Sequence, residues 1–216
     1  MISTSARSPA AISRAAASEI GVDYPDASFG GVTRLGTPFP MLLRDVVQRD
    51  GGLGDAVRRV QDARRTCHLI LTLADAKVQG TGAAPVVGVQ YGRDVARVMD
   101  DATLLPENKT WHPRIPGVVY WAMDWLCPSF NGALGRVLSA SHGNVTARGV
   151  ALGAFPVVST GNLHVLAVDM GDGDGDATFD AYVAFAAPQG DGGEAYGQGY
   201  HRLDLNALFG AERPRL

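Results

Sequence analysis

The side chains that could act as nucleophiles or metal ligands are few and widely spaced in this sequence. Cys67 and Cys127 are the two cysteines, and neither belongs to a CxxC or Cys/His spacing of the kind that binds zinc. The histidines show no HExxH or other paired spacing. They are His68, His112, His142, His164 and His201. We therefore expect buried apolar thiols, packed or surface histidines, and neither a metal site nor a disulfide scaffold.

Two further patterns resemble ligand-binding motifs, one for calcium and one for a dinucleotide, but neither has all the residues that its motif requires. Acidic residues alternate from Asp172 to Asp176, as in a calcium-binding EF-hand loop. That loop needs glycine at position six and a carboxylate at position twelve, where this chain has Ala177 and Val183. The stretch Gly80–Gly82 lacks the third glycine of a dinucleotide fingerprint. The first pattern predicts a polar hairpin turn, and no cofactor is expected.

Composition excludes several classes of protein. The chain has 216 residues, of which 46% are hydrophobic and 19% charged, enough for one packed domain spanning residues 1–216. A net charge of -3 without any basic run gives no electrostatic support for nucleic-acid binding. Apolar stretches are shorter than the ~20 residues of a membrane helix. These features predict a soluble chain that neither binds nucleic acid nor spans a membrane.

The first twenty residues do not contain the continuous apolar region of a secretory signal. They are rich in Ala, Ser and Arg, and no acidic residue precedes Glu19. This composition is compatible with an organellar transit peptide and equally with the interior of a domain, so the compartment stays open.

Helices and strands are predicted in blocks rather than as repeated strand–helix–strand units. Thr37 and Pro38 can cap and begin a helix that ends at Gly51-Gly52. Further helices are expected over 53–63, 118–126 and 129–141, and strands over 67–73, 85–91, 163–170 and 178–186. Residues 100–116 and 189–199 are expected to be loops, 146–155 could be helix or strand, and 203–209 forms a short terminal element. This order favours an α+β fold with antiparallel sheets.

Five segments, in this order and spacing, resemble one family. They are residues 18–45 (SEIGVDYPDASFG, then GTPFPMLLRD), 64–67 (RRTC), 117–131 (GVVYWAMDWLCPSFN), 160–165 (TGNLHV) and 200–209 (YHRLDLNALF). Together they resemble the later part of the isopenicillin-N acyltransferase-like cysteine hydrolases. That group belongs to the N-terminal-nucleophile superfamily, with bile-salt and penicillin-V amidases and acid-ceramidase-like amidases. The likeness runs from about Ile12 to Phe209.

The resemblance implies an αββα sandwich of two antiparallel sheets between helix layers, and cleavage or transfer of acyl groups at amide (C–N) bonds of N-acyl substrates. In such enzymes an autocatalytically exposed cysteine attacks the carbonyl group, its own α-amino group acts as base, and preorganised donors hold the oxyanion. No metal or cofactor is required.

The resemblance also implies that the nucleophile is absent from this chain. In the family, the nucleophilic cysteine and the Arg and Asp that follow it precede the segment matching Ser18–Val22, and here the preceding residues contain no cysteine. We therefore expect Met1 to lie inside the family domain, with the sandwich incomplete at its N-terminal end. Such a chain would be inactive alone, and a partner would be the missing N-terminal segment or chain.

Three residues are candidates for the family's site. Many relatives place an Asn directly before a His-Pro pair, whereas Trp111 precedes His112-Pro113 here and Asn108 lies three residues before Trp111. Asn108 is thus the candidate oxyanion donor, or that donor is lost. Arg65 and Arg202 are candidate partners of a substrate carboxylate or of the nucleophile, with packing or ion pairing as their alternative role.

Two other functions stay open. One is a non-catalytic binding or interaction module on the same scaffold. The other is a divergent hydrolase that uses Cys67 or Cys127, although Cys67 is expected to begin an interior strand and Cys127 to lie at a helix break before Pro128.

Overall fold

The computed structural model describes residues 26–75, 86–121, 128–158, 163–168, 180–187, 193–205 and 207. Within them, helices combine with two three-stranded sheets whose strands pair antiparallel throughout. The α+β class predicted from the order of the elements is therefore confirmed.

The first sheet has the strand order β1 (Leu69–Ala74), β2 (Val86–Tyr91) and β3 (Ala96–Met99). Its register pairs Leu71 with Val89 and Val89 with Val98. The strands predicted over 67–73 and 85–91 are confirmed with small shifts. Strand β3 was not expected.

Helices α2 (Phe39–Arg49) and α3 (Leu53–Asp62) cover one face of this sheet. The helices and strands share a single buried cluster. Its members are Leu42, Leu43, Val46, Ala56, Val60, Leu69, Leu71, Leu73, Val89 and Tyr91. Each fully buried aliphatic side chain of this size contributes about 1.5–3 kcal/mol of transfer free energy, so this cluster is a major source of stability.

The start of α2 differs from the prediction. Pro38 occupies the position before the first helical residue, and no side chain caps the helix. Thr37 instead donates its backbone N–H to the carbonyl of Arg64 at 2.8 Å. The cap expected from Thr37 is thus wrong, because its backbone ties the segment to the connection between α3 and β1.

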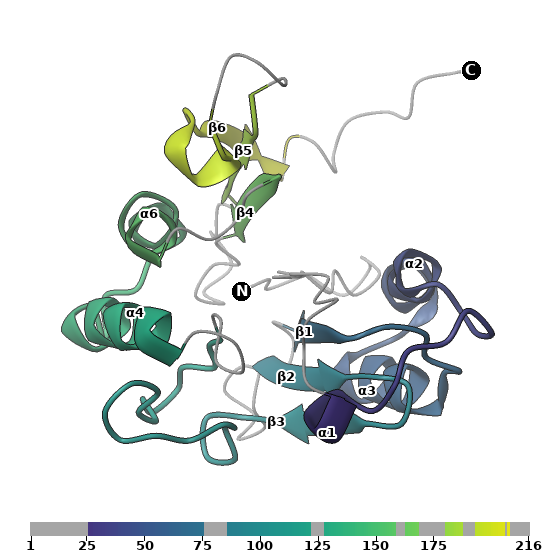
Figure 1. The fold of residues 1–216 in the computed structure, drawn as a ribbon. Helices are drawn as coiled ribbons and strands as arrows, with labels where there is room; N and C mark the ends of the chain where they lie inside the picture. Colours follow the sequence, from purple (N-terminus) through teal and green to yellow (C-terminus); the bar gives the residue numbers. More distant parts are fainter. Residues whose placement is uncertain are drawn as a thin grey trace.

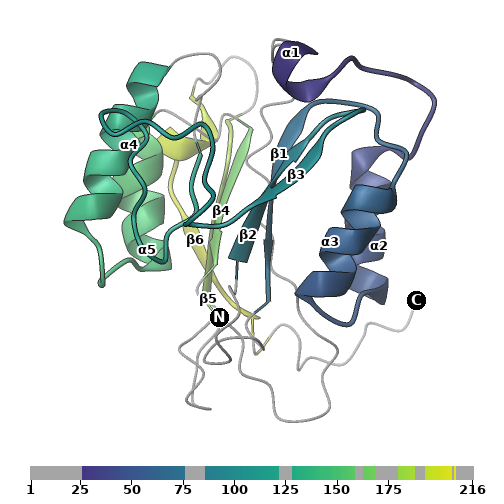
Figure 2. The same cartoon turned by 90° about the horizontal axis from the view of Figure 1, so that it is seen from below.

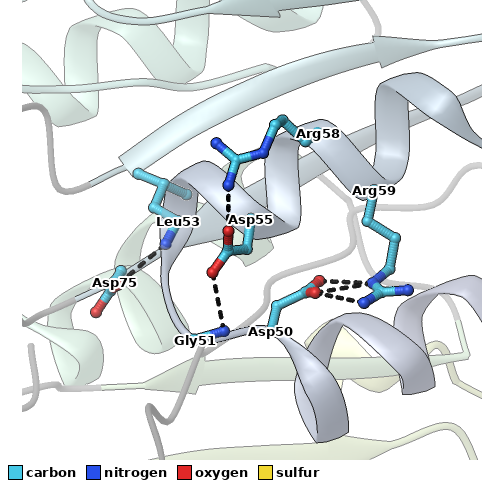
Figure 3. A network of polar contacts seen from close by, with 7 residues as sticks. All are labelled: Asp50, Gly51, Leu53, Asp55, Arg58, Arg59 and Asp75. Atoms are coloured by element: carbon cyan, nitrogen blue, oxygen red, sulfur yellow. Dashed lines mark hydrogen bonds and ion pairs between the residues drawn. The ribbon is translucent and has the colours of Figure 1, made fainter.

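The turn between α2 and α3 is held by the polar network drawn in Figure 3. The carboxylate of Asp50 accepts hydrogen bonds from Nε of Arg59 at 2.8 and 2.9 Å and from its Nη2 at 2.6 Å. Asp75, at the end of β1, accepts from the backbone N–H of Leu53 at 3.1 Å, so it satisfies a donor at the start of α3 that Gly52 cannot. The network fixes α3 against β1.

The other face of the first sheet is covered by α1 (Asp26–Phe29) and by the irregular segment that follows β3. Phe29 and Trp121 pack with Ile70 of β1. A Cβ atom at Gly88 would lie 1.6 Å from the ring of Trp121, so only glycine fits beneath that ring. The first sheet is therefore buried on both faces.

The second sheet has the order β4 (His164–Val168), β5 (Asp180–Phe185) and β6 (His201–Asp204). One of its faces packs against the helical stretch 147–158, through a cluster that includes Ala147, Ala151 and Ala167. The strands predicted over 163–170 and 178–186 are confirmed within the described residues. A short 3₁₀ turn, η3 (Ala195–Gly197), lies in the segment predicted as a loop.

Helix α4 (Pro128–Ala140) confirms the prediction over 129–141, with Pro128 as its first residue. The ambiguous stretch is helical and consists of α5 (Ala147–Gly149), the π-helical turn η2 (Val150–Ala154) and α6 (Phe155–Val158). In η2 the N–H of Phe155 bonds the carbonyl of Val150. Pro156 follows directly and has no N–H to donate, which explains why the helix is irregular here.

The helix expected over 118–126 is wrong for its described part. Val118 forms an isolated bridge with Ile115, and residues 119–121 have no regular secondary structure. The remaining residues of that range, including Cys127 just after it, lie outside the described part of the chain.

Figures 1 and 2 show how the two sheets are arranged. In Figure 2 the order from left to right is α4 and α5, then β4–β6, then β1–β3, then α2 and α3. Figure 1, turned by 90°, places β4–β6 above β1–β3. Each sheet thus has its own helices on one side, and the two sheets lie between the two groups of helices.

Candidate functional site

The segment between β3 and α4 contains the candidate oxyanion donor, Asn108. Asn108 and His112 exchange both backbone hydrogen bonds, at 3.1 and 2.9 Å, and so close a five-residue loop. The side-chain Oδ1 of Asn108 accepts from the N–H groups of Thr110 and Trp111 at 2.9 and 3.2 Å. Its oxygen therefore shapes this loop, while an oxyanion donor would use the other end of the same amide, Nδ2.

The buried side chain of His112 connects this loop to Tyr120. The ring is fully buried, and Nε2 lies 3.0 Å from the carbonyl oxygen of Tyr120. A carbonyl only accepts, so this contact requires the tautomer with hydrogen on Nε2. The ring also meets that of Tyr120 edge-on at 4.6 Å, and the Tyr120 hydroxyl donates to the carbonyl of Pro113 at 2.6 Å. His112 thus organises the loop that carries Asn108.

Arg65 is bound to backbone carbonyls at the end of α3. Its Nε donates to Gly92 at 2.8 Å, and its Nη1 donates to Val60 at 3.3 Å, to Ala63 at 3.1 Å, and to Gln61. The carbonyls of Val60, Gln61 and Ala63 are those that the C-terminus of α3 leaves without intrahelical partners, whereas Gly92 follows β2. The guanidinium of Arg65 is thus bound to backbone carbonyls, as in a packing role, and its role as a partner of a substrate carboxylate stays a prediction.

Arg202, the third candidate, lies on β6 opposite Tyr182 of β5. Its side chain is exposed. The three candidates stand on three separate segments. Arg202 is on β6, Arg65 is in the connection between α3 and β1, and Asn108 is in the segment between β3 and α4. Figure 1 shows β6 far from α3. No hydrogen bond or ion pair joins Arg65 to Asn108 in the described part of the chain.

Cys67 precedes β1 and is half-buried. Burial raises the pKa of its thiol, and a hydrogen bond with Thr66 offsets this in part. Cysteine attacks as the thiolate, so a raised pKa lowers the reactive fraction at neutral pH. The position fits a structural cysteine better than a nucleophile.

No group of three His, Cys, Asp or Glu side chains that could hold a metal ion occurs among the residues described. None of the helices described is both long and apolar enough to cross a bilayer.

One feature of this region was not indicated by the sequence. A surface pocket of about 220 Å³ lies where the Asn108 loop meets α4. It is lined by Thr110, Pro113, Gly132, Gly135, Arg136 and Ser139. The helical spacing of Gly132, Gly135, Arg136 and Ser139 places them on one side of α4 and could have indicated a close helix–loop contact. It could not have shown which loop makes that contact.

Comparison with known proteins gives two relatives from Dictyostelium discoideum. The chain is 31% identical over 139 residues to protein dcd1A, which is 63% of this chain and 30% of that protein. It is 30% identical over 143 residues to protein dcd1B, 65% of this chain and 27% of that protein. The chain thus spans less than a third of the relatives' length. No family model and no solved structure matches.

Proposed function

We propose that this chain carries the scaffold of an N-terminal-nucleophile cysteine hydrolase that cleaves or transfers acyl groups at amide bonds of N-acyl substrates. It does not itself contain the nucleophile, and it is inactive alone. The active enzyme then requires a cysteine from outside these 216 residues.

The observation that carries this proposal is the order of layers. Two antiparallel sheets lie between α4 and α5 on one side and α2 and α3 on the other, as seen in Figure 2. An αββα sandwich requires this order, and it agrees with the fold implied by the family resemblance. Fold alone does not determine function, so the family's segments must supply the chemical class.

The properties of Cys67 support the proposal that this chain does not contain the nucleophile. Acyl transfer needs a thiolate with a base beside it. The pKa of Cys67 is raised by burial. The backbone on its N-terminal side is pinned, because the carbonyl of Thr66 accepts from the N–H of Thr33 at 2.9 Å. Cleavage of the peptide bond before Cys67 would free an N-terminal nucleophile there. It would also break the covalent connection between β1 and the preceding segment, which includes Thr33 and helices α2 and α3.

The proposal is tested with a chimera of protein dcd1A in which the 139 matching residues are replaced by those of this chain. Both proteins and the isolated 216-residue chain are incubated with a panel of N-acyl amino acids and N-acyl amines, and amine release is measured. We expect turnover by dcd1A and by the chimera, blocked in both by a thiol-alkylating reagent, and none by the isolated chain.

Three outcomes would contradict the proposal. If dcd1A itself releases no amine from any N-acyl substrate, the chemical class is wrong. If dcd1A is active and a folded chimera is not, the scaffold is not equivalent. If the isolated chain is active and Cys67→Ala or Cys127→Ala abolishes this activity, the nucleophile lies within the chain.

A second function, a non-catalytic interaction module, is favoured by one specific observation. The face of the second sheet that turns away from α5 carries exposed apolar side chains, with Leu166, Phe185 and Leu203 at 37%, 63% and 38% exposure. Apolar patches of this kind mark protein contacts. If the chimera is inactive while the isolated chain binds the remainder of dcd1A, this second function replaces the first.

A further inference from the structure

We propose that the pocket between the Asn108 loop and α4 binds a small oxyanion, a carboxylate or phosphate group of a small molecule, with the guanidinium of Arg136 as its main partner. The hydroxyl groups of Thr110 and Ser139 line the same pocket and can donate further hydrogen bonds. This site is separate from the proposed acyl-transfer chemistry and does not depend on it.

Two glycines line the pocket, and one of them, Gly135, allows the loop to approach α4 closely. A Cβ at Gly135 would lie 3.2 Å from the Tyr120 hydroxyl and 3.3 Å from Cδ of Pro113, so a larger residue would push the loop away from α4. A Cβ at Gly132 would lie 3.4 Å from Nη1 of Arg136. This is an ordinary van der Waals distance, and it shows that the guanidinium of Arg136 lies back along the helix, over position 132.

The loop wall is fixed before any ligand arrives. Asn108 accepts from the N–H of Thr110 at 2.9 Å, and the Tyr120 hydroxyl holds the carbonyl of Pro113 at 2.6 Å. His112, between them, is fully buried. Because these residues are already ordered, a ligand would lose little binding free energy to ordering the loop.

Charge selects the class of ligand. Among the described residues that line the pocket, Arg136 is the one cation and none is a carboxylate. Arg136 is exposed, and no described residue forms an ion pair or hydrogen bond with it. By contrast, Arg114 on the same loop is paired with Glu107 at 2.8 Å. A planar guanidinium with free donors matches carboxylate or phosphate oxygens in a bidentate fashion.

Volume limits the size of the ligand. The pocket holds about 220 Å³, whereas sites for drug-sized ligands are roughly 300–1,000 Å³. One water occupies about 30 Å³ of liquid, so the pocket is large enough for a group of several heavy atoms. An oxyanion with a short organic substituent fits these bounds.

The test is an NMR titration of the full 216-residue chain, labelled with ¹⁵N, with inorganic phosphate and separately with acetate, at ionic strength held constant with sodium chloride. We expect saturable shifts of the Thr110, Gly132 and Gly135 amides. Arg136→Gln should weaken binding about tenfold or more, because the bidentate charged contact is lost. Ser139→Leu, which keeps the charge and fills the pocket, should also abolish the shifts.

Arg148→Gln is the matched control, since Arg148 is an exposed arginine on α5 that does not line the pocket. It should bind like the unchanged chain. The anion with the lower Kd, phosphate or acetate, shows whether the pocket prefers a phosphate or a carboxylate group. The proposal is overturned if neither anion gives saturable shifts, if chloride alone reproduces them, or if folded Arg136→Gln and Ser139→Leu variants bind as the unchanged chain does.

Discussion

The two sheets have the same number of strands and the same antiparallel pairing, but they are buried very differently. In the first sheet, Leu71 faces α2 and α3 and Ile70 faces Phe29 and Trp121, and neither side chain is more than 3% exposed. In the second, Val165 is equally buried towards the helices, while its neighbour Leu166 is 37% exposed.

The difference shows that the first sheet has both faces covered, whereas the second has one apolar face that is partly exposed. An antiparallel sheet can face water on one side when the residues on that side are polar. The outward positions of β4–β6 are instead largely apolar, with His164 and His201 among them. In Figure 2 this face is the one turned towards β1–β3. Its apolar side chains are those expected of a sheet face that packs against another layer of a sandwich.

The largest expected effect contrasts the two sheets directly. Leu71→Ala should lower the free energy of unfolding by about 2–5 kcal/mol, because it opens a cavity in a closed core. The matched change Leu166→Ala should cost less than about 1 kcal/mol, since that side chain is already partly in water. Urea unfolding of both variants measures the contrast. Equal costs would mean that the face of β4 is covered in solution.

Glycines give a second contrast. Gly88→Ala should destabilise by about 1–3 kcal/mol, because its Cβ would overlap the ring of Trp121. Adding Trp121→Leu should make the double variant more stable than the sum of the single changes, by about 0.5–3 kcal/mol. Gly153→Ala in η2, where the new Cβ meets nothing within 4 Å, should be neutral or stabilising. A Gly88→Ala variant as stable as the unchanged chain would contradict the close contact with Trp121.

Carboxylates at the ends of strands provide a third contrast between the two sheets. Asp75, at the end of β1, is buried and binds the N–H of Leu53, so Asp75→Ala should cost about 1–2 kcal/mol. Asp204, at the end of β6, is exposed and binds the N–H of Ala207 at 2.9 Å. Asp204→Ala should cost about 0.5 kcal/mol or less. Thermal unfolding monitored by circular dichroism compares the two variants. A larger loss of stability in Asp204→Ala than in Asp75→Ala would contradict the claim that the first sheet is the more tightly held of the two.

A last contrast between the two sheets is expected in alkali, and it is confined to pH values above about 10. Burial raises the pKa of Tyr91, in the first sheet, to about 12, and burial also raises that of Tyr200, beside the second. A tyrosine whose pKa is raised by folding stabilises the native state below its ordinary pKa of about 10, and this contribution is lost as the pH rises towards the folded value. Tyr91→Phe should therefore flatten the fall in stability between about pH 10 and 12. An unchanged slope would show that Tyr91 ionises normally.

Sequence patterns predicted the elements whose periodicity was long and regular. Helix α3 followed from Leu53, Ala56, Val57 and Val60 at helical spacing. The apolar runs of β1 and β4 were equally clear. Strand β3 has only four residues, of which Arg97 is exposed, and so short an alternation does not stand out from a loop.

The site was harder to predict, because it depends on contacts between distant segments. A run such as that of β4 does not indicate which of its faces is covered. The sequence does not decide whether Arg65 is a partner of a substrate carboxylate or a packing residue, and its bonds to the carbonyls of Gly92 and Ala63 are tertiary contacts. Trp121 lies in a range expected to be helical, and its role over Gly88 follows from tertiary packing that no local pattern specifies.

The most direct test of the proposed function is complementation in trans. Protein dcd1A lacking the 139 residues that match this chain is mixed with the purified 216-residue chain, and amine release from N-acyl substrates is followed. We predict that neither component is active alone and that mixing restores turnover that depends on a cysteine of the dcd1A portion. Absence of turnover after mixing, with both components folded and bound and intact dcd1A active, would contradict the claim that this chain supplies the scaffold of the enzyme.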